Sequence, residues 1–97
     1  MKIALDFDDT YTRAPSFWDK FITMAKDHAY DIRIVTFRKS TMTDPALDWI
    51  AVEKRIPIIF TEYIGKRAYC RYIGWEPDIW IDDSPEFIVL PMQHELP

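Results

Sequence analysis

The chain has 97 residues, of which 48% are hydrophobic and 15% aromatic, and this composition favours a small packed domain over a disordered chain. The net charge of −4 argues against non-specific binding to nucleic acid or to anionic membranes. A single cysteine, Cys70, excludes an internal disulfide and a multi-cysteine zinc site, and it suits a reducing cytoplasm.

No apolar run reaches the length that a membrane span requires, and the N-terminal residues are typical of a strand, not of a secretion signal. We therefore expect a cytoplasmic protein with no membrane partner. One domain, covering residues 1–97, is the expected organisation.

The first element is expected to be a buried strand, because Ile3, Leu5 and Phe7 alternate within a short apolar run. The run stops in a stretch with three carboxylates and a threonine, Asp6-Phe7-Asp8-Asp9-Thr10. Buried charge is costly unless it is paired or coordinates a cation. These acids should therefore face either solvent or a metal ion.

Strand-like and helix-like segments alternate along the chain. Apolar runs predict strands at residues 3–7, 31–36, 58–60 and 79–81. Amphipathic patterns predict helices at residues 15–29, 45–54 and 66–73. Residues 87–90 are either a fifth strand or a turn, and residues 91–97 are expected to be irregular. The alternation predicts an α/β fold with three layers, Rossmann-like, with a small parallel sheet of four or five strands.

Helix boundaries and faces follow from individual residues. Pro15 and Pro45 each suit the first turn of a helix, Asp44 suits a cap, and Gly74 suits a helix end. The expected apolar face of the first helix consists of Phe17, Trp18, Phe21, Ile22, Ala25 and Ala29. The expected apolar face of the third helix consists of Ala68, Tyr69, Tyr72 and Ile73.

In an open parallel sheet the carboxyl ends of the strands share one edge, and ligands bind there. Several polar residues follow or end the predicted strands, and a lysine begins the third helix. We expect one pocket to contain Asp6, Asp8, Thr36, Lys66, Asp82 and Asp83.

These residues occur in the order of the four motifs of the haloacid dehalogenase-like phosphohydrolases, and the chain resembles this family over nearly its whole length. The resemblance implies a magnesium-dependent phosphomonoester hydrolase in which Asp6 is the nucleophile and forms an aspartyl phosphate. It implies that Asp8 is the general acid and then the general base. Thr36 and Lys66 would hold the phosphate oxygens.

The same resemblance implies a Mg²⁺ site formed by the Asp6 side chain, the Asp8 backbone carbonyl and one of Asp82 and Asp83. Asp83 is favoured for direct contact. Asp82 would then orient Lys66 or a metal-bound water, although the two acids could exchange these roles.

Arg38 lies two residues after Thr36, where the phosphatase half of polynucleotide kinase-phosphatases carries a phosphate-binding arginine. This position favours a nucleic-acid-end or nucleotide phosphate as the substrate. Arg13 is a second candidate clamp at a less well matched spacing, and Arg67 competes with the preferred Lys66. The run from Asp82 to Pro85 also resembles small protein phosphatases, so a phosphoprotein substrate is the alternative.

Each gap between the motifs holds one helix and one strand, which leaves no room for a cap domain. Capless relatives act on phosphates of macromolecules or use a neighbouring subunit as a lid, so a homo-oligomer stays an open alternative. A non-catalytic binding or regulatory protein of the same fold should show a degraded motif, and none is visible. A phospho-receiver domain also combines acids, a threonine and a lysine, but in a different chain order.

Overall fold

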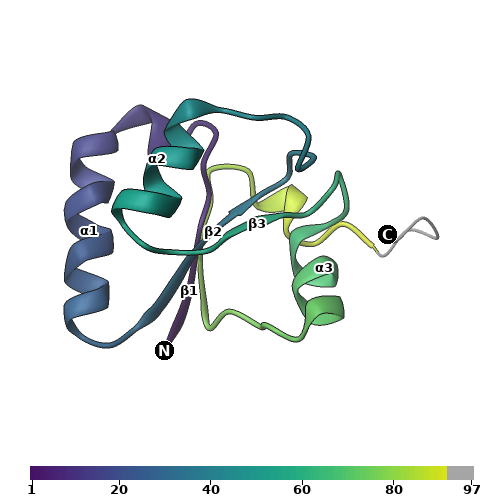
Figure 1. Ribbon diagram of the computed structural model, residues 1–97. Coiled ribbons are helices and arrows are strands. Elements are labelled where there is room, and N and C mark those ends of the chain that lie inside the picture. Colours follow the sequence, from purple (N-terminus) through teal and green to yellow (C-terminus); the bar gives the residue numbers. More distant parts are fainter. Residues whose placement is uncertain (92–97) are drawn as a thin grey trace.

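A computed structural model describes residues 1–91 of the chain, and its centre is a four-stranded parallel sheet (Figure 1). The strands are β1 (Lys2–Leu5), β2 (Asp31–Thr36), β3 (Ile58–Phe60) and β4 (Ile79–Ile81). The helices are α1 (Pro15–Asp27), α2 (Pro45–Glu53) and α3 (Lys66–Ile73), with short 3₁₀ helices η1 (Tyr11–Arg13) and η2 (Pro85–Phe87). The strand order is β3-β2-β1-β4. The predicted Rossmann-like α/β fold is confirmed.

The helices lie in two layers, with α1 and α2 on one face of the sheet and α3 on the other (Figure 1). Side chains alternate between these faces along each strand. The larger core lies under α1 and α2 and contains Ile3, Leu5, Phe7, Tyr11, Ile22, Ala25, Ile32, Ile34, Leu47, Ile50 and Ile56. The smaller core lies under α3 and contains Ala4, Val35, Ile59, Cys70 and Trp75.

The chain leaves β1 toward β2 and β3, and then crosses back to place β4 on the opposite side of β1. Leu5 is paired with Ile34 of β2 and with Ile81 of β4, so the three strands end nearly level. The connection after β1 runs to one side of the sheet, and the connection to β4 runs to the other side. A crevice therefore forms between the carboxyl ends of β1 and β4, which is where open α/β sheets bind ligands.

Two details of the first helix differ from the prediction. The helix ends at Asp27, and Ala29 lies beyond it with a positive φ of 59°. Phe17 is 60% exposed, while Ile22 and Ala25 are buried against the sheet. The apolar face is therefore shorter than the spacing indicated, because Phe17 and Ala29 lie outside it while Trp18 and Phe21 pack against the core.

The predicted apolar face of α3 is confirmed for Tyr69, which packs against the smaller core, and is wrong for Tyr72 and Ile73. Tyr72 and Ile73 are exposed, whereas Cys70 is completely buried. Cys70 packs in the same small core as Ala4 of β1. Small side chains on both sides let the short helix approach the sheet closely, and Tyr72 and Ile73 are left on its outer surface.

The segment after β4 is not a fifth strand. Residues 85–87 form η2, and the chain then runs across the start of α3, where Arg67 N–H donates to the Ile88 carbonyl at 3.0 Å. The expected irregular tail falls, from residue 92 onward, outside the described residues. Among residues 1–91, none of the helices has the length and apolar character needed to cross a membrane.

Candidate functional site

Three carboxylates meet at the carboxyl ends of β1 and β4. Asp6 directly follows β1, and Asp82 and Asp83 directly follow β4. One carboxylate oxygen from each lies within 4.8 Å of the others, which is close enough to share a cation. The backbone explains this convergence, because Asp6 N–H continues the β1–β4 ladder by donating to the Ile81 carbonyl at 2.9 Å. The predicted meeting of these acids is confirmed.

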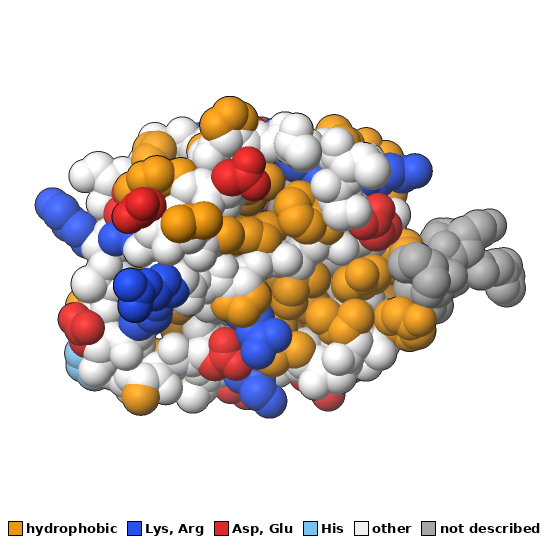
Figure 2. Space-filling view, in the orientation of Figure 1, with side chains coloured by type: hydrophobic (Ala, Val, Ile, Leu, Met, Phe, Trp, Pro, Cys, Tyr) orange, Lys and Arg blue, Asp and Glu red, His pale blue; other side chains and the backbone are white. Residues whose placement is uncertain are grey.

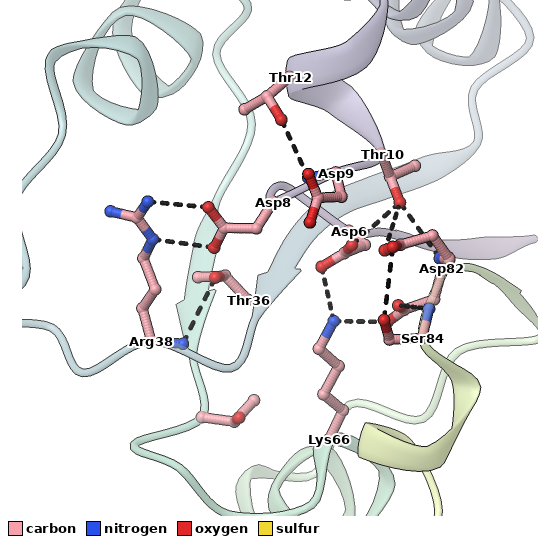
Figure 3. A network of polar contacts seen from close by, with 12 residues as sticks. Asp6, Asp8, Asp9, Thr10, Thr12, Thr36, Arg38, Lys66, Asp82 and Ser84 are labelled. Carbon is pink, nitrogen blue, oxygen red and sulfur yellow. Dashed lines mark hydrogen bonds and ion pairs between the residues drawn. The ribbon is translucent and has the colours of Figure 1, made fainter.

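Lys66, the first residue of α3, extends into this cluster (Figure 3). Its Nζ donates to Asp6 Oδ1 at 2.7 Å and also to Asp82 Oδ2. The lysine is 2% exposed, so both ion pairs are shielded from water. Arg67 is exposed, and the structure therefore places Lys66 in the cluster, as preferred from the sequence.

Gly65, which directly precedes Lys66, packs closely against the chain that follows η2. A Cβ atom at position 65 would lie 2.3 Å from the Leu90 carbonyl oxygen, which is closer than real atoms pack. Only glycine lets the chain after η2 cross this tightly over the beginning of α3.

Thr10 connects the two ends of the cluster, a role that sequence reasoning did not assign. Its hydroxyl donates to Asp6 Oδ2 at 2.9 Å and accepts from Asp83 N–H at 3.2 Å. The turn that begins at Phe7 carries Thr10 back over β1, with Thr10 N–H donating to the Phe7 carbonyl at 3.4 Å. The spacing of four residues between Asp6 and Thr10 was the available signal.

Asp8 does not join the carboxylate cluster. Its two oxygens accept from Arg38 Nε and Nη2 at 2.9 and 2.8 Å, a fork-to-fork ion pair (Figure 3). Arg38 also lies 3.6 Å from Asp44. The pKa of Arg38 is raised, chiefly by the hydrogen bond to Asp8. The side chain expected to bind phosphate and the side chain expected to protonate the leaving oxygen therefore bind each other.

Thr36 and Arg13 are the two remaining candidates for phosphate binding. Thr36 ends β2 and is fully buried, and its hydroxyl accepts from Arg38 N–H at 3.4 Å. Arg13 ends η1 on the exposed surface. Neither is among the described residues that line the hollow at this edge of the sheet.

That hollow has a volume of about 370 Å³, within the range of small-ligand sites. Its charged side is formed by Asp6, Asp8, Asp9, Arg38, Lys66, Asp82 and Asp83, together with the hydroxyl of Ser84. Its apolar side is formed by Phe37, Met42, Tyr63 and Phe87. The apolar side was not expected, because its residues lie in loops and in η2, where no periodicity marks them.

Burial raises the pKa of Asp6 to about 6, although Lys66 opposes this, while Asp82 and Asp83 add to it. The pKa of Asp83 is lowered, chiefly by its hydrogen bond with the Asp6 carboxyl group. Three carboxylates beside one ammonium group leave an excess of negative charge at this point. Clustered aspartate oxygens are the donors that hard divalent cations prefer, so these residues could hold such an ion.

Comparison of the chain with protein-family models, with curated proteins and with solved structures gave no match. The structure itself shows a small parallel α/β domain whose switch point carries an acidic triad. Any further assignment depends on the chemistry of this site.

Proposed function

We propose that the protein is a Mg²⁺-dependent phosphomonoester hydrolase of the haloacid dehalogenase-like kind, with Asp6 as its nucleophile. The observation that carries this proposal is the buried Asp6 carboxylate, held by Lys66 and Thr10 beside two further acids. A nucleophile needs a fixed direction, and these two hydrogen bonds engage one Asp6 oxygen each. The hollow in front of Asp6 gives a phosphate ester room to approach.

The Mg²⁺ ion would be held by Asp6, Asp83 and the Asp8 backbone carbonyl. Asp82 Oδ2 accepts from the Lys66 cation and Oδ1 accepts from Ser84 N–H at 2.9 Å. The donors to Asp83 are the neutral hydroxyls of Thr10 and Ser84, at 3.2 and 3.4 Å, which a cation can displace more easily. This supports Asp82 as the residue that orients Lys66 and Asp83 as the direct ligand. When bound, Mg²⁺ supplies positive charge that reduces repulsion between the carboxylate nucleophile and the anionic phosphate.

In the first chemical step an Asp6 oxygen attacks phosphorus and the ester P–O bond breaks. Asp8, once it has left Arg38 and taken up a proton from solvent, gives that proton to the departing oxygen, and an aspartyl phosphate remains on Asp6. In the second step water attacks phosphorus and gives a proton to Asp8. The Asp6–phosphorus bond breaks, so inorganic phosphate leaves and both aspartates return to their starting state.

The Asp8–Arg38 ion pair has to open in this cycle, because Asp8 must reach the leaving oxygen. We assign Arg38 to a phosphate oxygen of the bound substrate, which competes with Asp8 for the same guanidinium. Arg38 lines the hollow together with Asp6, so the exchange needs a side-chain movement and no change of fold. Lys66 holds a second phosphate oxygen while it remains close to Asp6.

The closed ion pair also favours a second candidate function. A protein that binds a cation or a phosphate group without turnover would have no need to free Asp8. This non-catalytic regulatory protein of the same fold is the alternative that the activity assay has to exclude.

The test is hydrolysis of an aryl phosphate with Mg²⁺ and, separately, with a chelator. Asp6→Asn should abolish turnover, because the change keeps the side-chain shape and removes the attacking charge. Asp27→Asn is the matched control, since Asp27 is an exposed acid at the end of α1 and should retain full activity. Undiminished activity of folded Asp6→Asn, or full activity in chelator, would exclude the proposed mechanism.

The role of Asp8 is tested by comparing two leaving groups. An alkyl phosphate leaves as a strongly basic alkoxide, whereas an aryl phosphate leaves as a stable phenolate that needs little protonation. General acid catalysis is worth about 10²- to 10⁴-fold, so Asp8→Asn should slow the alkyl substrate by far the larger factor. Equal losses with the two substrates would assign proton transfer to another residue.

A further inference from the structure

Three aromatic rings form one continuous surface on the apolar side of the hollow. We call Phe37, Tyr63 and Phe87 the aromatic wall. The Phe37 ring centroid lies 4.6 Å from that of Phe87 and 5.5 Å from that of Tyr63. The rings come from the loop after β2, the loop after β3 and η2, and all three line the same hollow as Asp6. A phosphate ester held at Asp6 therefore has its organic group beside this wall.

The wall is held in place by backbone contacts between its loops. Tyr63 N–H donates to the Phe37 carbonyl at 2.9 Å, and Glu62 N–H donates to the Arg38 carbonyl at 3.2 Å. The Glu62 side chain accepts from Ser40 N–H at 3.0 Å. These bonds tie the loop after β3 to the loop that carries Arg38, so the wall and the charged side of the hollow keep a fixed relation.

Tyr63 is held there at a conformational cost. Glu62 and Tyr63 have φ values of 56° and 62°, and left-handed backbone is unfavourable for residues other than glycine. Backbone strain of this kind gathers at ligand sites. Tyr63 lines the hollow, so the left-handed backbone of this pair positions its ring there.

The rings of the wall remain available to a ligand. Tyr63 is 49% exposed and Phe87 is 37% exposed, and Figure 2 shows hydrophobic side chains gathered over the middle and the α3 side of the molecule. Neighbouring exposed apolar side chains next to a polar site are typical of a binding surface. A flat, apolar-faced group would cover these rings better than a small polar one.

We propose that this flat group is a nucleobase, so that the substrate is a nucleoside monophosphate unit, either free or at the end of a nucleic-acid strand. The inference rests on the proposed phosphatase function and names its substrate class. Aromatic side chains stack on bases of any sequence. Arg38 and Lys39 follow Phe37 directly, and Lys39 Nζ lies 5.6 Å from the Tyr63 ring centroid. These cations favour a ligand with phosphate groups over a peptide.

The experiment compares each nucleotide with the same sugar phosphate lacking the base. Adenosine 5′-monophosphate is paired with ribose 5-phosphate, and adenosine 3′-monophosphate is paired with ribose 3-phosphate. Stacking of one base corresponds to about a fivefold to 150-fold preference in kcat/KM. Tyr63→Leu and Phe87→Leu should each bring this ratio toward one. Phe17→Leu, which changes an exposed ring on α1, should leave the ratio unchanged.

Further substrates decide the source of the base. Oligonucleotides with a terminal 3′- or 5′-phosphate that are hydrolysed better than the mononucleotides would identify a strand end, and the reverse order would identify a free nucleotide. A ratio near one in the unmodified protein would overturn the inference. Preference for a phosphotyrosine peptide over every nucleotide, lost in Tyr63→Leu, would also overturn it.

A binding measurement separates this inference from the proposed function. The Asp6→Asn protein with Mg²⁺ is titrated with the same nucleotide and sugar phosphate pairs by calorimetry. If no ester is hydrolysed by the unmodified protein but the nucleotides still bind more tightly, the hydrolase proposal fails and the wall is supported. If esters are hydrolysed without any effect of the base on binding or rate, the wall fails and the hydrolase proposal stands.

Discussion

Replacing Lys66 by methionine removes the cation that contacts both Asp6 and Asp82, while keeping an apolar side chain in the same channel. Lys66 is 2% exposed and the Asp6 side chain 7%, so solvent screens this pair only weakly. Removing one partner of a buried ion pair typically costs about 3–5 kcal/mol, because the other charge is left unpaired. This is a large part of the roughly 5–15 kcal/mol that stabilises a typical domain.

The assay is unfolding of the metal-free protein by urea and by heat. For a domain of this size 1 kcal/mol corresponds to about 4–8 °C in Tm, so Lys66→Met should melt at least about 12 °C lower. Lys20→Met is the matched control, since Lys20 is exposed on α1 and should shift stability by less than about 0.5 kcal/mol.

The loss in free energy of unfolding caused by Lys66→Met, which we call the stability deficit, should also depend on pH. Burial raises the folded-state pKa of Asp6 to about 6 from 3.8. The folded protein thus holds a proton more tightly than the unfolded chain, and this contribution to stability is lost as pH rises through the folded pKa. Without Lys66 the pKa of Asp6 rises further, so the deficit should grow from about pH 5 to about pH 8. A deficit below about 1 kcal/mol at pH 8 would refute the argument that Lys66 neutralises the cluster.

The remaining predictions concern the metal, the start of α3 and the thiol. Mg²⁺ should raise the Tm of the protein, and Ca²⁺ should bind without supporting turnover because its looser coordination misplaces the phosphate; unchanged melting in both ions would contradict the site. Gly65→Ala should destabilise the fold by about 1–3 kcal/mol and lower activity, because the added Cβ would lie 2.3 Å from the Leu90 oxygen. Equal stability of the two proteins in urea would show that the chain at Leu90 does not pack tightly against the start of α3. Burial raises the pKa of Cys70 to about 11, so a thiol reagent at pH 8 should label the folded protein slowly and the unfolded protein at once. Rapid labelling of the native protein would show that α3 opens.

The carboxylate cluster was predictable because its members follow strands that are strongly marked in the sequence. Alternation identified β1, and the short apolar run before Asp82 identified β4. Parallel topology then required their ends to meet at one edge, as Asp6 and Asp82 do. The placement of Lys66 followed in the same way, because it begins the helix that connects β3 to β4.

The side chains in the loops could not be placed by this reasoning. The pairing of Asp8 with Arg38 depends on the path of two loops across the edge of the sheet, which strand periodicity does not determine. Tyr63 reaches the hollow through a positive φ that its residue type disfavours. The error on α3 has a different cause, since the spacing of Tyr72 and Ile73 suggested a core face that a thinly covered side of the sheet could not bury.

The central claim is that Asp6 becomes phosphorylated. The most direct measurement is to mix the protein with Mg²⁺ and a phosphate ester carrying labelled phosphorus, quench with acid within the first turnover, and map the label by peptide mass spectrometry. The account predicts a label on the peptide that contains Asp6, released by hydroxylamine as an acyl phosphate and absent from Asp6→Asn. Hydrolysis that proceeds without any labelled peptide, or a label that persists in Asp6→Asn, would contradict the account.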